Sequence, residues 1–137
     1  MMAEHRLQHQ GIAGTVGGHD DALVRVVWVY DTKFPWSLKL IVHGRNPLMR
    51  LVSRDLLNRG VSVPTGDLDL WIRPEFFARP AQVRFLIHVV DGLTMQLDLN
   101  RDDLIELLDE AERLVPFGTE EKFQDWDGGL ALCEGAA

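Results

Sequence analysis

Residues 49–66 read MRLVSRDLLNRGVSVPTG, and this stretch predicts a strand that runs directly into a short helix and then stops. The extended apolar run ends at Val52, and the Ser53 hydroxyl can cap a helix by accepting a free backbone N–H. Gly60 lies where a left-handed residue commonly ends a helix, and Pro64 prevents the helix from resuming. The stretch therefore predicts a rigid corner, and none of its residues is arranged for catalysis.

Length and composition predict one soluble domain. A chain of 137 residues is long enough to bury a core without disulfide bonds. Its single cysteine, Cys133, excludes a disulfide framework and a multi-thiolate zinc site, and it is consistent with a reducing cytoplasm. No apolar run approaches the ~20 residues that span a bilayer, and the N-terminus has no apolar core of a signal peptide. We expect a cytoplasmic protein without membrane insertion.

The charge is unevenly distributed. The net charge is −7, but from Asp98 onward there are twelve acidic and three basic residues, a balance of 3 − 12 = −9. Residues 1–97 hold nine acidic and eleven basic residues, a balance of 11 − 9 = +2. Phosphate backbones will repel the acidic end. The charge pattern therefore predicts that nucleic acid is not the main partner.

Period-two patterns predict about six to seven strands. Residues 22–30 are almost continuously apolar, as expected of a strand covered on both faces, and residues 36–43 and 83–89 alternate between apolar and polar. The Asp91-Gly92 pair between two alternating runs predicts a tight hairpin. These strands precede a single long helix.

Asn100 is expected to cap that helix, and its apolar residues fall on one face. Strands first and a helix last predict an α+β fold in which the helix packs lengthwise on the sheet. The apolar face consists of Leu104, Leu107, Leu108, Ala111, Leu114 and Val115.

Domain limits follow from the loss of these patterns. Residues 1–21 are polar and glycine-rich, and we expect a flexible arm with an edge strand only near residues 12–16. The folded domain is expected over residues 22–130, and residues 131–137 form a tail. The sheet would have more apolar surface than one long helix can cover, which predicts a homo-oligomer.

No residues predict a catalytic, cofactor or metal site. An oxygen cage for a divalent cation needs about six ligands, and neither the Asp67/Asp69 pair nor the Asp125/Asp127 pair has such neighbours. His43 and His88 lack a cysteine or paired carboxylate at metal-ligand spacing, and no base accompanies Ser53 as a candidate nucleophile. His5 and His9 are four apart and could chelate a metal if helical, but two solvated histidines on an arm are the simpler interpretation. Residues considered and interpreted as structural or surface groups are Asp67, Asp69, Asp125, Asp127, His5, His9, His43, His88 and Ser53.

Single-stranded nucleic-acid binding is the alternative to a purely protein-binding role. Basic residues fall on or beside the strands, and aromatic residues could stack on bases. The bases are scattered singly, so a solvated sheet face is the simpler interpretation. The residues concerned are Arg25, Lys39, Arg45, Arg50, Arg54, Arg59, Arg73, Arg79 and Arg84, with Trp28, Trp36, Trp71, Phe76 and Phe77.

An ordered set of short motifs resembles one known family. The motifs span residues 23–130, over three quarters of the chain. They comprise Tyr30-Asp31, Pro35, Arg54-Asp55-Leu56-Leu57, Gly60, Pro64-Thr65-Gly66 and Val115-Pro116-x-Gly118-Thr119-Glu120, followed by Asp125 and Asp127. In this order and spacing they resemble the SsgA-like proteins of actinomycetes, which regulate sporulation-associated cell division.

The resemblance implies a non-enzymatic role without a cofactor. The family's implied fold is a curved antiparallel sheet with helices, related to whirly-like single-stranded nucleic-acid-binding regulators and assembled as a trimer. The implied partners are division-machinery proteins, including the tubulin-like GTPase or another family member, at the septum. This chain departs from the pattern after Gly66, where an extra Thr-Gly is missing, and in the aromatic loop at residues 74–80.

Overall fold

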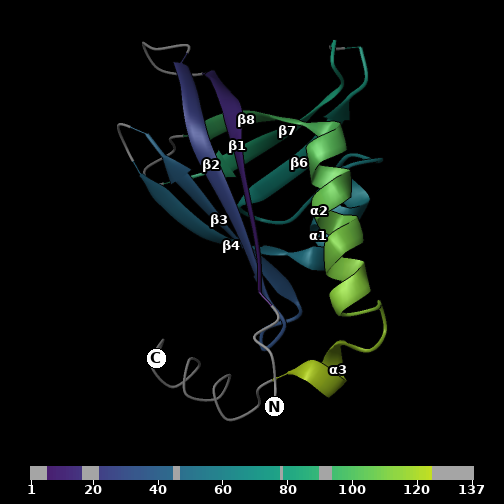
Figure 1. Ribbon diagram of the computed structural model, residues 1–137. Helices are drawn as coiled ribbons and strands as arrows, with labels where there is room; N and C mark the ends of the chain where they lie inside the picture. Colours follow the sequence, from purple (N-terminus) through teal and green to yellow (C-terminus); the bar gives the residue numbers. More distant parts are fainter. Residues whose placement is uncertain (1–5, 17–21, 45–46, 78, 90–93, 125–137) are drawn as a thin grey trace.

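The computed structural model describes residues 6–16, 22–44, 47–77, 79–89 and 94–124. Eight strands form one curved antiparallel sheet in the order β4-β3-β2-β1-β8-β7-β6-β5, and the long helix α2 lies along one face (Figure 1). The strands are β1 (Arg6–Val16), β2 (Ala22–Asp31), β3 (Ser37–His43), β4 (Leu48–Ser53), β5 (Thr65–Gly66), β6 (Leu70–Glu75), β7 (Gln82–His88) and β8 (Thr94–Asn100). The helices are α1 (Arg54–Gly60), α2 (Arg101–Leu114) and α3 (Glu120–Phe123).

The structure confirms an antiparallel sheet with one long helix, but it corrects the strand count of six to seven. The expected flexible arm does not hold for Arg6–Val16, which form β1 between β2 and β8. β1 pairs with β2 from Arg6↔Asp31 to Thr15↔Ala22. Gly11 and Gly14 interrupt any apolar alternation in β1, so the sequence pattern does not reveal this strand. Its pairing with β2 places it in the sheet. The short β5 adds the eighth strand.

The core lies between the inner face of the sheet and α2. Val26, Trp28 and Tyr30 of β2 point into it and are buried. The apolar face predicted for α2 is confirmed, with Leu104, Leu107, Leu108, Ala111 and Val115 buried and Leu114 partly buried against the core. Each large aliphatic side chain contributes about 1.5–3 kcal/mol when fully buried, before the cost of ordering the chain.

Both predicted helix caps are present. The backbone N–H of Leu56 donates to Ser53 Oγ at 3.2 Å, and the backbone N–H of Asp103 donates to Asn100 Oδ1 at 3.1 Å. A side-chain oxygen at the N-cap accepts from one of the free N–H groups of the first turn, which favours the helix start. Both helices therefore begin where the local sequence predicts.

Gly60 is not the left-handed cap that the sequence predicts. It is the last residue of α1, and Val61 after it is right-handed, with φ of −72°. Gly60 is buried, and a Cβ atom there would lie 2.4 Å from Ile72 Cγ2. The glycine is therefore needed because α1 packs closely on β6.

Two other expectations fall at the limits of the described residues. β7 and β8 pair antiparallel from Gln82↔Asn100 to His88↔Thr94, as a hairpin requires. The Asp91-Gly92 turn itself lies outside the described residues, as does the tail at residues 131–137.

Candidate functional site

Arg54 occupies the corner between β4 and α1, and its side chain points into the protein. Its backbone N–H donates to the carbonyl oxygen of Trp36 at 2.9 Å, so the ladder between β3 and β4 continues into the first residue of α1. The side chain then lies on the inner side of the sheet and is 2% exposed. Such burial requires charge partners, because removing an isolated guanidinium from water is costly.

Three side chains supply those partners. Arg54 Nη1 donates to Tyr30 Oη at 3.1 Å, and Nη2 donates to Glu112 Oε2 at 3.1 Å. Nη1 also lies 3.6 Å from Glu120 Oε1. The Phe117 ring covers the guanidinium, with 4.0 Å between Cζ and the ring centroid. We call this set (Tyr30, Arg54, Glu112, Phe117 and Glu120) the Arg54 junction.

The two carboxylates are held by the backbone of the turn after α2. Glu112 Oε2 accepts the backbone N–H of Phe117 at 2.9 Å, and Glu120 Oε2 accepts that of Gly118 at 2.9 Å. Gly118 has φ of +88°, in the left-handed region that favours glycine. The turn is closed by Thr119, whose backbone N–H donates to the carbonyl of Pro116 at 3.0 Å. The motif at residues 115–120 therefore shapes a turn around Arg54.

Tyr30 connects the junction to the loop between β2 and β3. Its hydroxyl donates to the backbone carbonyl of Pro35 at 2.9 Å while accepting from Arg54. Burial of the phenol raises the pKa of Tyr30 to about 12, and the neighbouring Arg54 acts in the opposite direction without reversing the shift. Tyr30 therefore remains a neutral hydrogen-bond donor at physiological pH.

The fold brings seven of the predicted motif residues together. Tyr30, Pro35, Arg54, Gly118 and Glu120 meet through direct contacts, and Pro116 and Thr119 close the turn that holds them. The others lie elsewhere. Asp31 accepts the N–H of Lys33 in a turn, Asp55 is exposed in the first turn of α1, Leu56 and Leu57 are core residues, Gly60 packs on Ile72, Pro64 is exposed and Gly66 packs on Trp71.

Glu112 and Phe117 belong to the junction but are not marked in the sequence. Glu112 is one of several acidic residues on α2, and nothing in its spacing separates it from the solvated ones. Phe117 is the variable position within the motif at residues 115–120. Only the packing of α2 on the sheet brings them to Arg54.

Three groups of the junction are buried, whereas the Glu112 side chain is 44% exposed and Phe117 is 40% exposed. The Arg54 side chain is 2% exposed, that of Glu120 is 7% exposed, and Tyr30 is completely buried. A substrate therefore has no access to these groups. Within the described part of the chain, no group of three or more His, Cys, Asp or Glu is placed to hold a metal ion.

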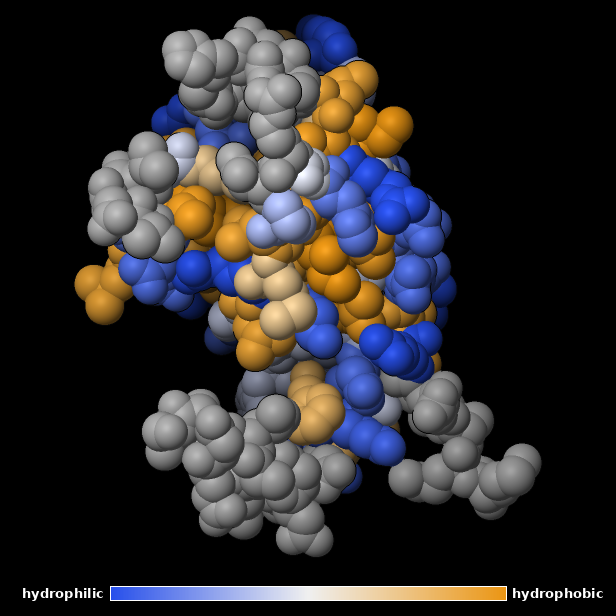
Figure 2. All heavy atoms as spheres, turned by 90° about the vertical axis from the view of Figure 1, so that its left-hand side faces the viewer, coloured by the Kyte–Doolittle hydropathy of each residue, from blue (hydrophilic) through white to orange (hydrophobic). Residues whose placement is uncertain are grey.

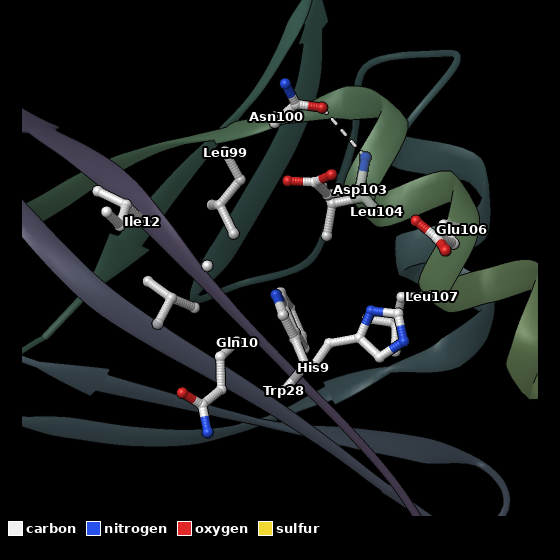
Figure 3. Close-up of a pocket in the computed structure, with 12 residues that line it drawn as sticks. His9, Gln10, Ile12, Trp28, Leu99, Asn100, Asp103, Leu104, Glu106 and Leu107 are labelled. Atoms are coloured by element: carbon white, nitrogen blue, oxygen red, sulfur yellow. Dashed lines mark hydrogen bonds between the residues drawn. The ribbon is translucent and has the colours of Figure 1, made fainter.

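A separate cavity of about 170 Å³ lies between β1, the end of β8 and the first turns of α2 (Figure 3). Trp28, Leu99, Leu104 and Leu107 are among its lining residues, together with His9. The volume is below the about 300–1,000 Å³ of pockets that enclose drug-sized ligands. His9 contacts Glu110, and no serine, threonine or cysteine is among the described residues that line the cavity. The cavity therefore gives no support for catalysis or for a nucleotide site.

The remaining candidate groups have structural or surface positions. Ser53 caps α1, and Asp67 accepts the backbone N–H groups of Asp69 and Leu70 in a turn. His43 and His88 are exposed. His5, Asp125 and Asp127 lie outside the described residues.

Several arginines of the alternative nucleic-acid-binding face are paired with carboxylates. Arg84 lies between Asp98 and Glu75, and Arg73 also pairs with Glu75. The hydrogen bond to Asp98 raises the pKa of Arg84. Arg54 is buried. These pairings weaken the case for a nucleic-acid-binding face, although Trp71 and Phe77 are exposed.

Among the described helices, none has the length and apolarity needed to cross a membrane.

Comparison with known proteins identifies relatives at the level of family and fold. The family model described as Streptomyces sporulation and cell division protein, SsgA, matches residues 24–120. A solved structure from work on SsgB mutations that correlate to longitudinal cell division during sporulation of Streptomyces coelicolor is similar, with a TM-score of 0.80 and 21% identity; the match covers 90% of this chain and 98% of that one. An SsgA-like sporulation-specific cell division protein from Thermobifida fusca YX-ER1 has a TM-score of 0.82 and 19% identity over 96% of this chain and 97% of its own. Curated protein sequences gave no match.

Proposed function

This chain belongs to the SsgA family of sporulation and cell division proteins, and we propose that it acts in sporulation-specific division as a non-enzymatic scaffold. In this role it is a cytoplasmic protein recruited to the septum. There it helps to position the tubulin-like division GTPase and the septal wall machinery, directly or through another family member.

The Arg54 junction carries this proposal. The motif residues that meet in space form a closed, buried contact between the β4–α1 corner and the turn after α2. Such a contact holds a shape, because Tyr30 is completely buried and Arg54 is 1% exposed. Motif residues that hold a surface in place are consistent with a protein that works by binding other proteins.

Exposed apolar side chains give the scaffold surfaces on which to bind. On the outer face of the sheet, away from α2, Ile12, Leu23, Met49 and Leu51 are each at least 64% exposed. Figure 2 shows hydrophobic atoms at the surface on the side where β2, β3 and β4 lie. Exposed apolar patches of this kind commonly mark protein–protein contacts. Self-association, with a homotrimer as the favoured state, is part of the proposal.

A fluorescent fusion of the full chain in a sporulating actinomycete tests the role. We expect foci at sporulation septa that coincide with the tubulin-like GTPase. The Arg54→Met variant should lose the foci as the fold is destabilised, and its matched control, the exposed Arg59→Met variant, should keep them. A stable fusion that stays diffuse during septation contradicts the proposal.

Light scattering on the purified protein tests self-association separately. At tens of micromolar protein, a trimer should have three times the mass of the chain. A monomer under these conditions removes self-association from the proposal while leaving the septal role to be judged by the fusion.

A further inference from the structure

We propose that the free edge of β4 binds an extended segment of a partner protein with the pattern apolar–acidic–apolar, which adds a strand to the sheet. β4 (Leu48–Ser53) is at one end of the strand order, and among the described strands only β3 pairs with it. Such strand addition is a common mode of peptide recognition. The inference rests on the proposed scaffold function for the existence of a protein partner, and on the geometry of β4 for the chemistry of that partner.

The register identifies which backbone groups face the free edge. Arg54 N–H donates to Trp36 O, which marks this pair as one whose residues bond to each other across the ladder. In an antiparallel ladder such pairs alternate with pairs that do not. Because bonded pairs recur at every second residue, the next two are Leu38↔Val52 and Leu40↔Arg50. Val52 and Arg50 therefore direct their backbone groups to β3. Met49 and Leu51, between them, therefore direct their N–H and C=O groups away from β3.

The same two residues present apolar side chains. Met49 is 64% exposed and Leu51 is 65% exposed, and both lie on the outer face of the sheet. Cross-strand neighbours on one face make direct contact, so apolar residues opposite Met49 and Leu51 would bury both. This requirement gives the two apolar positions of the partner pattern.

Arg50 gives the acidic position. It lies between these residues and points to the opposite, inner face, where it is half-buried. Within the described residues its guanidinium has no hydrogen bond or ion pair, and its Nε atom is buried without a partner. An inward-pointing charge on an edge strand opposes pairing with a strand that offers no counter-charge. An acidic residue opposite Arg50 would satisfy it and so select the partner.

Fluorescence anisotropy with the full chain and a fluorescein-labelled peptide centred on Val-Glu-Val tests the inference. We expect saturable binding, weakened about tenfold when the glutamate is replaced by glutamine, since a hydrogen bond to a charged group is lost. Methylation of the peptide's backbone nitrogens that face β4 should weaken binding by a similar factor. Equal affinity for the glutamate and glutamine peptides would overturn the charge assignment, and no binding at millimolar peptide would overturn the site.

Two protein variants locate the site. Leu51→Pro removes an N–H that faces the free edge, a position where proline is tolerated, and should abolish peptide binding. Arg50→Gln should bind the glutamate and glutamine peptides equally. Lys39→Gln on the neighbouring β3 is the control and should keep the glutamate preference. Circular dichroism verifies that each variant is folded. If Leu51→Pro does not fold, Arg50→Gln and the methylated peptide still decide whether the peptide binds at the edge of β4.

A second copy of this chain is the competing occupant of the edge. If Leu51→Pro converts an oligomer into a monomer while the wild type does not bind the peptide, the edge serves self-association and the inference is overturned. The septal fusion is independent of these measurements. Septal foci without peptide binding reject only the edge site, whereas peptide binding with a diffuse fusion rejects only the division role.

Discussion

Nη1 of Arg54 lies 3.6 Å from Oε1 of Glu120, and the two side chains are 2% and 7% exposed. This contact joins the corner after β4 to the first residue of α3, two segments that are far apart in the sequence. A buried ion pair offers little net stability over an apolar pair, but breaking it leaves an uncompensated buried charge. The pair therefore acts as a requirement on the fold: the turn after α2 must meet the sheet at this corner.

Replacing Arg54 with methionine should lower the free energy of unfolding by about 3–5 kcal/mol, because Glu120 would remain buried without its partner. Urea unfolding followed by circular dichroism measures the change. Arg59→Met on the exposed side of the same helix is the control and should cost less than about 1 kcal/mol. If Arg54→Met matched the stability of the control, the junction would not hold the turn.

Gly60→Ala should destabilise the protein by about 1–3 kcal/mol because the new methyl overlaps Ile72, which is completely buried. In an open helix the same change would be favourable by about 1 kcal/mol, so the sign of the effect reports the overlap. Thermal unfolding is the measurement. Gly11→Ala is the matched control, since nothing lies within 4 Å of the added atom. A Gly60→Ala protein as stable as the wild type would rule out close packing of α1 on β6.

Gly118→Ala should cost about 1–2 kcal/mol because φ of +88° is strained for a residue with a Cβ atom. No atom lies within 4 Å of the added methyl, so the backbone conformation alone is tested. Chemical unfolding gives the magnitude. Gly118→Asn should recover part of the loss because asparagine tolerates the left-handed region, and equal losses for both variants would argue against this origin.

Tyr30 is the only tyrosine, so the ultraviolet absorbance of its phenolate reports one group. In the folded protein the titration midpoint should be at about 12, against 10.0 for an unperturbed phenol. Because the folded pKa is the higher one, this group's stabilisation is complete below pH 10.0 and is lost as pH rises towards 12. Titration in denaturant gives the reference midpoint. A native midpoint near the denatured value would mean that the hydroxyl is not buried.

Local features of the fold could be predicted from sequence. Ser53 and Asn100 cap their helices as predicted, and the apolar stripe of α2 faces the core. These features depend on groups within a few residues of each other, so their physics is contained in short stretches. The family could also be predicted, because the motif order and spacing are properties of the chain.

Features that depend on distant residues could not be predicted in the same way. β1 carries no apolar alternation, and its position depends on the ladder with β2. The sequence predicts a left-handed cap at Gly60 because it does not show that Ile72 of β6 lies against this glycine. A glycine chosen for space and one chosen for its dihedral angles look the same in a sequence.

The stretch at residues 49–66 shows where this division lies. By itself the sequence determined a strand, a serine cap, a short helix with buried Leu56 and Leu57, and the absence of any recognisable catalytic set. Only the tertiary structure decided that Arg54 is buried rather than exposed, because its burial depends on Glu112 and Glu120. Those carboxylates are brought to the corner when α2 packs on the sheet, and charge compensation across the core makes the buried guanidinium stable.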